Sequence, residues 1–408
     1  MRRTRTGPWA DPCFQRYRSE IDIATSASMN LSERIAYRLT RLRYRRLVVS
    51  DTPRSKPLFL LCYGTLTKLA NLLRAHREYK ALNSTISTYP YSIRIEPVSA
   101  CNMACPLCPT GTGEIDRDKK LFPVALFQRL LDELGKYVIE THLWVWGEPL
   151  LHKHLSELIG TATSAGVGTE VSTNLGIKLS DDDIDRLILS GLSWLIVSID
   201  GTSKETYERY RIKGDFDLVI RNLGRIAERK RALGRLLPFV EWQLVPNKYN
   251  EHEIPGLLEF ARARGADGAR LKPIRLDKVK GRSFAGRIAS SFIETWLPTK
   301  SEWTHSLSEV THAYHDFHCP FLWGHFTVYP QGSVAPCCET ISAADDLASL
   351  AHSAALPIWR GAALQEARRA AIGRASNPNS ACARCQVFAK PYPKSITSSA
   401  ASPQSTNP

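Results

Sequence analysis

Residues 95–108 read Ile-Glu-Pro-Val-Ser-Ala-Cys-Asn-Met-Ala-Cys-Pro-Leu-Cys, which places the thiols of Cys101, Cys105 and Cys108 on one short loop. The loop follows Ile93–Val98, an apolar run that predicts a β-strand. Three thiolates can hold three irons of a cubane iron–sulfur cluster and leave the fourth iron without a protein ligand. An open position of this kind is typical of catalytic rather than structural metal sites. The spacing therefore suits a catalytic iron–sulfur cluster with one open iron, and a zinc loop or a chance spacing of cysteines stays open at this point.

Strand and helix patterns alternate from residue 92 to residue 275. Six strands are predicted, over Ile93–Val98, Val138–Trp146, Val167–Thr173, Trp194–Ile199, Phe239–Val245 and Ala269–Ile274. Helical periodicity separates them, and Ser180 followed by Asp181–Asp183 has the composition of a helix N-terminus. The alternation predicts the α/β class, with a parallel sheet or a partial (β/α)6 barrel. Functional residues of such folds collect at the carboxyl ends of the strands.

The cysteine loop resembles the signature of the radical S-adenosylmethionine (SAM) superfamily, and the resemblance extends over roughly residues 92–388. It implies a [4Fe–4S] cluster whose open iron binds the amino and carboxylate groups of SAM. An electron from the cluster would then cleave SAM to a 5′-deoxyadenosyl radical, which abstracts a hydrogen atom from the substrate. One departure is Leu107, because the family commonly has an aromatic residue at this position, beside the adenine.

The segment Trp146-Gly147-Glu148-Pro149 follows the second predicted strand and resembles the family's GGEP motif, with Trp146 in place of the first glycine. By that resemblance, Gly147, Glu148 and Pro149 belong to the SAM site. Glu148 and the adjacent backbone should accept hydrogen bonds from the SAM ammonium group, since a carboxylate suits an ammonium through a charge-assisted hydrogen bond. Taken alone, Gly-Glu-Pro predicts only a turn.

Two later strand ends and a segment after them carry further resemblances. Ser172-Thr173-Asn174 resembles the family's STNG segment, which implies ribose contacts by Ser172 and Asn174. Ser198, in a segment that resembles SxDG, is implied near the SAM carboxylate. Arg211 is implied as a bidentate partner of the same carboxylate. Each segment could instead be a capped turn or a solvated charge, but their order after Cys108 favours a common site.

A second group of thiols, Cys319, Cys337, Cys382 and Cys385, lies near the C-terminus. A predicted hairpin carries Cys337, and Cys382-Ala-Arg-Cys385 forms a C-x-x-C knuckle. Four thiolates can hold zinc or an iron–sulfur cluster, and spacing alone does not separate the two. The arrangement, which includes a Gly-x4-Cys element and Trp359, resembles the C-terminal SPASM or twitch extension of radical SAM proteins. That resemblance implies an auxiliary [4Fe–4S] cluster, with Cys338 either a bystander or a hydrogen-atom donor.

Composition and charge narrow the setting. The 408 residues include 43% hydrophobic and 23% charged residues, which is ordinary for a soluble globular protein. No apolar segment follows the Arg-rich N-terminus, and Pro57–Thr67 is too short to span a bilayer. We therefore expect a cytoplasmic protein without a transmembrane segment. In a reducing compartment, spaced cysteines are more often metal ligands than disulfides.

The net charge of +14 is concentrated at the N-terminus, where residues 1–56 hold 13 Lys and Arg against 5 Asp and Glu. Leu31–Val48 predicts a helix with two distinct faces. One face carries Leu31, Ile35, Leu39 and Leu42, and another carries Arg34, Arg38, Arg41 and Arg45. Such a helix either packs on its own protein with a solvated basic face or makes peripheral contact with a membrane or an acidic partner.

We expect four regions: a basic helical N-terminal extension (1–90), a radical SAM core (91–290), a small α+β SPASM/twitch-like cluster domain (300–390) and a disordered tail (391–408). The preferred function is a radical SAM oxidoreductase that dehydrogenates or epimerises a small polar metabolite such as a sugar, cyclitol or nucleotide-linked compound. Its electrons would come from a donor such as flavodoxin or ferredoxin. No catalytic acid or base can be named from the sequence.

Two alternatives stay open. Many SPASM relatives modify ribosomal peptides, so the chain could be a peptide maturase. The net charge and the C-x-x-C knuckle would also suit a zinc-dependent nucleic-acid-binding protein. The basic residues cluster away from the cysteines, however, and no stacking platform is evident, so no specific nucleic acid partner is expected.

Overall fold

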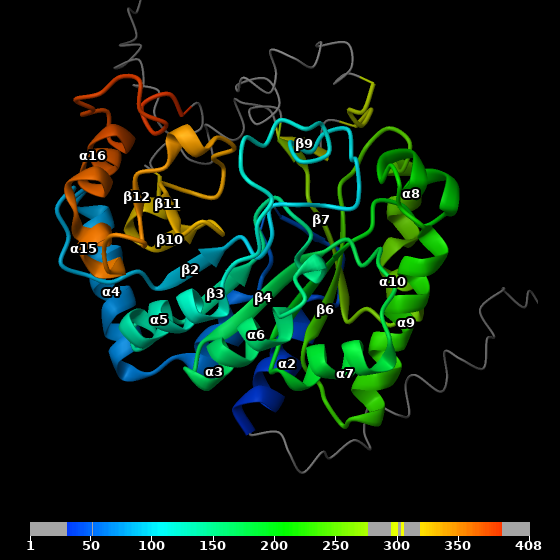
Figure 1. Cartoon of the computed structure of the whole chain (residues 1–408). Coiled ribbons are helices and arrows are strands. Elements are labelled where there is room, and N and C mark those ends of the chain that lie inside the picture. The colour runs from blue at the N-terminus through cyan, green and yellow to red at the C-terminus, as the bar shows by residue number, and fades with distance from the viewer. Residues whose placement is uncertain (1–30, 51, 276–294, 301–302, 306–318, 386–408) are drawn as a thin grey trace, which may run out of the picture.

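The computed structural model describes residues 31–50, 52–275, 295–300, 303–305 and 319–385 (Figure 1). A ten-stranded sheet runs through these residues in the order β1-β7-β6-β5-β4-β3-β2-β10-β11-β12. The strands from β1 to β10 in this order pair in parallel, and β10, β11 and β12 pair antiparallel. A separate pair joins β8 (Ile274–Arg275) to β9 (Thr304–His305). The expected α/β class with a parallel sheet is confirmed.

The six predicted strands are all present, although most are shorter than the sequence pattern indicated. They are β2 (Ser92–Ile95), β3 (Glu140–Leu143), β4 (Gly168–Thr173), β5 (Trp194–Ser198), β6 (Phe239–Leu244) and β7 (Gly268–Leu271). Nearly every residue of these strands is buried. Burial on both faces is what a parallel sheet covered by crossover segments requires.

Helices alternate with these strands and cover one side of the sheet (Figure 1). They are α5 (Val124–Leu134), α6 (Leu155–Ser164), α7 (Asp181–Leu189), α8 (Lys204–Tyr210), α9 (Phe216–Ala232) and α10 (Leu257–Ala263). The predicted start of α7 is confirmed, because Ser180 and Asp183 form a reciprocal capping box. Before α10 the chain forms a 3-10 turn, η3 (Glu251–Gly256), which contains Pro255.

The N-terminal segment adds α2 (Leu31–Arg43), β1 (Val48–Val49), α3 (Lys56–Tyr63) and α4 (Leu66–Lys80). Residues 31–50 therefore contribute a strand as well as a helix, since β1 pairs in parallel with β7. Among the described helices, none combines the length and the apolarity that crossing a membrane would need.

The predicted apolar face of α2 is not its buried face. Leu31, Ile35, Leu39 and Leu42 are between 44% and 73% exposed. The face toward the protein carries Tyr37, and Tyr44 lies one residue beyond the helix; their hydroxyls donate to the buried carboxylates of Asp267 and Glu241. The Tyr44 ring also packs on Trp194 and Phe239. Aromatic burial with a satisfied hydroxyl therefore orients the helix, and contact of its outer face with a membrane stays a prediction.

The C-terminal segment forms the expected hairpin, which is followed by two helices. Its elements are η5 (Phe321–Trp323), β10 (His325–Val328), β11 (Ser333–Ala335), η6 (Ala343–Asp345), β12 (Ala348–Ser349), α15 (Ala355–Arg360) and α16 (Ala362–Ala371). Strand β10 pairs in parallel with β2, with Val328 opposite Ile95. The hairpin therefore continues the main sheet and lies beside the strand that leads into the first cysteine loop. The predicted disordered tail lies outside the described residues.

Buried charges join the N-terminal segment to the sheet. The guanidinium of Arg270 donates to Glu241 at 2.6 Å and to Gln243 at 2.5 Å, and its third nitrogen reaches the carbonyl of Ser50 at 2.8 Å. The Arg270 and Glu241 side chains are at most 1% exposed. Burial raises the pKa of Glu241, while Arg270 acts in the opposite direction. The charged form of the buried Glu241 carboxylate is therefore stabilised by the positive charge of Arg270.

We expect Arg270→Met to lower the free energy of unfolding by about 3–5 kcal/mol, because it leaves a buried carboxylate unpaired. Denaturant unfolding followed by circular dichroism would measure the change. The control is Arg186→Met: Arg186 is 56% exposed and pairs with Asp183 on the surface of α7, so its loss should cost less than about 1 kcal/mol. Equal effects of the two substitutions would contradict the prediction.

Candidate active site

The first cysteine loop leaves the carboxyl end of β2 and brings its three thiols together. Cys105 is buried, and Cys101 and Cys108 are half-buried. The pKa of Cys101 is raised to about 12 and the pKa of Cys105 to about 11, mainly by burial and in smaller part by neighbouring thiols. Protons therefore stay on these thiols until a metal displaces them, as is usual for sites in which metal binding releases protons.

The donor set of the first loop is three thiols, and thiolates are the usual protein ligands of iron–sulfur clusters. A cubane cluster binds its thiolates through separate irons and so holds them farther apart than one zinc ion does. Three interacting thiols on one loop are the arrangement that such a cluster with one open iron requires.

The turn that follows β3 is fastened to this loop by the buried carboxylate of Glu96. That carboxylate accepts hydrogen bonds from the backbone N–H groups of Trp146 at 2.7 Å and Gly147 at 3.1 Å. Burial raises the pKa of Glu96 to about 8, although the two N–H donors act against the rise. A Cβ atom on Gly147 would lie 1.8 Å from the carbonyl oxygen of Val98. Only glycine fits at this position, so the close approach to Val98 explains why the motif has a glycine at residue 147.

Glu148 points away from open space and toward the end of β4. Its carboxylate accepts from the Thr173 hydroxyl at 2.5 Å and from the backbone N–H groups of Asn174 at 2.7 Å and Leu150 at 3.0 Å. Its backbone N–H donates to the carbonyl of Ala100 at 2.8 Å. Three of the roughly four acceptor positions of a carboxylate are therefore in use. Sequence reasoning placed Glu148 in the site but did not predict this tie to β4.

Two amides interlock beside Cys101. The Asn174 side chain donates to the Asn102 side-chain oxygen at 2.9 Å and approaches the Cys101 sulfur at 3.7 Å. Asn102 in turn donates to the carbonyl of Gly176 at 2.9 Å. Sequence reasoning assigned no role to Asn102, although an amide between two predicted cluster cysteines was a visible signal.

Arg211 lies against both Asp200 and the cysteine loop. Its Nε donates to Asp200 at 2.6 Å, and its Nη1 approaches the Cys105 sulfur at 3.8 Å. Asp200 is fully buried and also accepts from the backbone N–H of Val245 at 2.6 Å. Sequence reasoning missed the Asp200–Arg211 pair, because nothing in the spacing of the two residues indicates that their side chains meet.

The remaining predicted residues lie at neighbouring strand ends. Ser198, the last residue of β5, accepts a hydrogen bond from the Gln243 side chain at 3.2 Å. Ser172 lies in β4 beside β5 and is half-buried. Direct contacts with the thiols are therefore made by Asn174 and Arg211, whereas Ser172 and Ser198 lie at the same edge of the sheet.

The second cysteine group is also brought together. Burial raises the pKa of Cys319, and the neighbouring Cys382 and Cys385 raise it further. The pKa of Cys382 rises through burial and through Cys337 and Cys385. The four thiols thus lie close enough to interact, as a shared cluster requires. Cys338 has a different partner, since the guanidinium of Arg94 on β2 donates to its sulfur at 3.2 Å.

Comparison with known proteins agrees with this geometry. Residues 95–239 match the model of the radical SAM superfamily, and residues 319–386 match the iron–sulfur cluster-binding SPASM domain. The two matches include all seven cysteines of the two groups, and the second match also contains Cys338. The expected cofactors, SAM with its [4Fe–4S] cluster and an auxiliary iron–sulfur cluster, are those of these two domain types.

Two relatives and one solved structure illustrate the similarity. The mycofactocin maturase MftC of Mycolicibacterium smegmatis is 28% identical over 187 residues, which are 46% of this chain and 45% of MftC. The chain thus matches less than half the length of that relative. The PqqA peptide cyclase of Rhodopseudomonas palustris is 26% identical over 325 residues, which are 74% of this chain and 83% of the cyclase.

SuiB of Streptococcus suis has the same fold, with a TM-score of 0.53 at 16% identity over 86% of this chain and 80% of SuiB. At this identity the likeness concerns the fold alone. The two domain matches carry the assignment: this chain is a radical SAM enzyme with a C-terminal SPASM-type iron–sulfur domain.

Proposed function

We propose that this radical SAM enzyme modifies a peptide. The observation that carries the proposal is the similarity to the PqqA peptide cyclase, which extends over 74% of this chain and 83% of the relative. A structure of SuiB, which shares the fold, contains its precursor peptide SuiA. These comparisons favour the peptide alternative over a small polar metabolite, which was the preferred expectation from the sequence.

We assign Cys101, Cys105 and Cys108 as the ligands of the SAM-binding cluster. When bound, the cluster and SAM supply a 5′-deoxyadenosyl radical. The assignment is supported by the mutual proximity of the thiols and by the half-exposed positions of Cys101 and Cys108. The second cluster is assigned to Cys319, Cys337, Cys382 and Cys385, whose thiols interact in the same way.

The residues around the first cluster then have separate tasks. Arg211, held by Asp200 and directed at Cys105, would bind the SAM carboxylate beside the cluster. The backbone carbonyls of the turn at Gly147 and Pro149 would accept from the SAM ammonium group, because the Glu148 carboxylate is largely engaged in holding Thr173 and Asn174.

Ser172, Asn174 and Ser198 would line the nucleoside end of the SAM site. This role rests on their position at the carboxyl ends of β4 and β5, where ligands of parallel α/β folds bind. The electron donor, the cytoplasmic location and the division into four regions stay predictions.

The first prediction concerns iron and SAM cleavage. Protein purified without oxygen should hold about eight irons per chain if both groups of thiols bind cubane clusters, and it should release 5′-deoxyadenosine when SAM and a strong reductant are added. Replacing Cys101, Cys105 and Cys108 together by Ala should leave about four irons and abolish 5′-deoxyadenosine formation. Turnover by the triple variant would refute the assignment of the radical site.

The second prediction concerns Arg211. Arg211→Lys retains a positive charge near Asp200 but removes the planar fork that suits a carboxylate. Losing one hydrogen bond to a charged group costs about 1.5–3 kcal/mol, so the Kd for SAM should rise roughly ten- to one-hundred-fold. Titration of SAM against the electron paramagnetic resonance signal of the reduced cluster would measure it. The matched control is Arg209→Lys, since Arg209 packs over Tyr249 instead; a Kd that moves equally in both variants would contradict the role.

The third prediction concerns the substrate. Short peptides encoded beside the gene should raise 5′-deoxyadenosine formation above the rate with SAM alone and should change in mass after turnover, as followed by mass spectrometry. The triple Ala variant serves as the control. Stimulation by sugars, cyclitols or nucleotides, without stimulation by any such peptide, would instead support a small polar metabolite as the substrate.

A further inference from the structure

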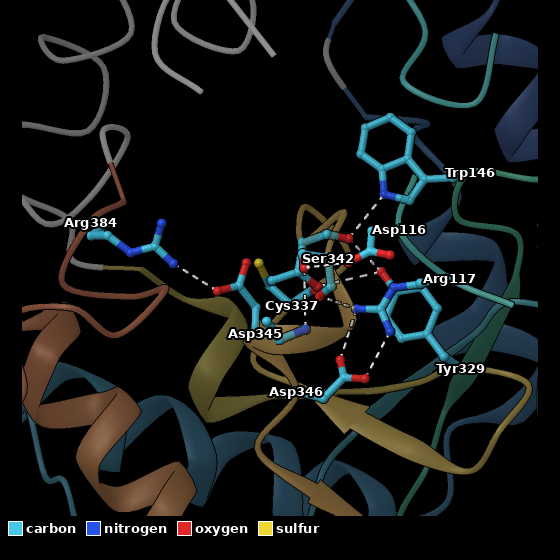
Figure 2. A network of polar contacts seen from close by, with 11 residues as sticks. Asp116, Arg117, Trp146, Tyr329, Cys337, Ser342, Asp345, Asp346 and Arg384 are labelled. Carbon is cyan, nitrogen blue, oxygen red and sulfur yellow. Dashed lines mark hydrogen bonds and ion pairs between the residues drawn. The ribbon is translucent and has the colours of Figure 1, made fainter. Parts of the chain in front are cut away.

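Trp146 connects the SAM-binding turn to the segment that follows Cys337 (Figure 2). Its backbone N–H donates to Glu96, as described above, so its main chain belongs to the turn beside the first cluster. Its side chain points away from that turn, and the indole N–H donates to the carbonyl of Thr340 at 3.3 Å. The residue therefore has its main chain in one site and its side chain at the other.

The Thr340 carbonyl is held from two sides. Besides Trp146, the hydroxyl of Tyr329 donates to it at 2.8 Å. The Thr340 hydroxyl donates back to the carbonyl of Cys337 at 3.1 Å. The position of the Cys337 backbone thus depends on Thr340, and Thr340 is fixed by two ring donors from different parts of the chain.

Arg117 fastens the same segment at a second point. Its guanidinium forms two hydrogen bonds of 2.8 Å with Asp346 and donates to the carbonyl of Ser342 at 2.9 Å. It also lies 3.5 Å from the ring centre of Tyr329. The Arg117 side chain is 1% exposed, so this bidentate pair is shielded from water. Figure 2 shows Arg117, Asp346 and Tyr329 beside the Cys337 segment.

The segment 340–346 also contacts the C-x-x-C knuckle that carries Cys382 and Cys385. Arg384, which lies between Cys382 and Cys385, donates to Asp345 at 2.8 Å. One turn therefore touches Cys337 through Thr340 and the C-x-x-C knuckle through Asp345. The contacts that hold segment 340–346 on the core therefore also help to position the backbone at Cys337 and at the C-x-x-C knuckle.

A neighbouring tryptophan separates this role from general packing. Trp144 lies two residues earlier, is half-buried like Trp146, and donates its indole N–H to Glu170 of β4 at 3.1 Å. The indole N–H of Trp144 thus donates to the sheet, whereas that of Trp146 donates to the cysteine-bearing segment. The Trp144 ring also lies 4.7 Å from the guanidinium of Arg94, and Trp144→Phe keeps a ring there while removing only the N–H. Trp146 also occupies the position of the first glycine in the family's GGEP motif. A glycine there has no side chain that could make this contact.

We propose that Trp146 is a positioning residue of the auxiliary cluster site, so that one residue of the SAM-binding turn sets how firmly Cys337 holds the second cluster. The inference rests on the proposed assignment of the two cysteine groups as cluster ligands. It adds a physical link between the two sites: a displacement of the turn at Trp146 is passed to Thr340 and from there to Cys337.

The test examines the auxiliary cluster alone, in the full-length Cys101→Ala/Cys105→Ala/Cys108→Ala variant. Trp146→Phe is added to this background, with Trp144→Phe as the matched control. After anaerobic reconstitution, the rate of iron release to an excess of chelator is followed by the loss of visible absorbance. Removal of one neutral hydrogen bond corresponds to about 1 kcal/mol, so Trp146→Phe should release iron about fivefold faster than the parent. It should also shift the paramagnetic resonance spectrum of the reduced cluster, while Trp144→Phe should do neither.

Tyr329→Phe provides a second variant, because it removes the other donor to Thr340 while leaving a ring for Arg117 to cover. It should accelerate iron release in the same direction, and the double variant should show a non-additive effect since both donors serve one carbonyl. Thermal unfolding midpoints of the iron-free variants would show whether folding has changed.

The outcomes are distinct. If the parent triple variant binds no iron, the assignment of the auxiliary cluster fails and takes this inference with it. If the parent binds iron but Trp146→Phe releases it at the parent's rate with an unchanged spectrum, the inference alone fails. Equal acceleration by Trp146→Phe and Trp144→Phe would also overturn it, because the effect would then be a general loss of packing.

Discussion

The parallel pairing of β2 with β3 on one side and β10 on the other decides where the chemistry of this protein takes place. Parallel strands end at a common edge of the sheet, so the cysteine loop after β2 and the Trp146 turn after β3 emerge side by side. Because β10 joins the same sheet, the hairpin that carries Cys337 starts from the neighbouring strand. Two cysteine groups that are more than two hundred residues apart in the sequence thereby follow neighbouring strands of the same sheet.

Buried arginine–carboxylate pairs stabilise this framework at the points where segments meet. Arg270 with Glu241 joins β7 to β6, Arg211 with Asp200 holds the edge of the cysteine loop, and Arg117 with Asp346 joins the core to the auxiliary segment. A buried pair contributes little net stability compared with apolar packing, but the loss of one partner is costly. Such pairs therefore enforce a particular arrangement, which suits sites where the position of a ligand matters more than total stability.

The environment of the candidate site combines water exclusion with a dense set of hydrogen bonds. Glu96 and Glu148 are buried acceptors that use their oxygens to hold backbone N–H groups, and both have a raised pKa because of burial. Asn102 and Asn174 interlock beside Cys101 in a similar way. Most of the polar atoms near the first cysteine loop thus orient other protein groups, which leaves the difficult chemistry to a cofactor.

The sequence by itself determined the parts of this protein that depend on short-range patterns. Cys101, Cys105 and Cys108 lie within eight residues, so their spacing and its resemblance to a known signature predicted an open cluster site. The six strands followed from alternating runs, and the capping box at Ser180 followed from the residues beside it. The GGEP-like turn was also visible, although the reason for Gly147, a clash with the carbonyl of Val98, was not.

Only the tertiary structure decided the contacts between distant segments, because no local pattern encodes which strands become neighbours. It turned the leucine stripe of α2 outward, since the hydroxyls of Tyr37 and Tyr44 reach carboxylates about two hundred residues away. It paired Asp200 with Arg211, engaged Glu148 with β4, and brought the indole of Trp146 to Thr340. Each of these depends on the sheet order, which long-range packing selects and residue spacing cannot specify.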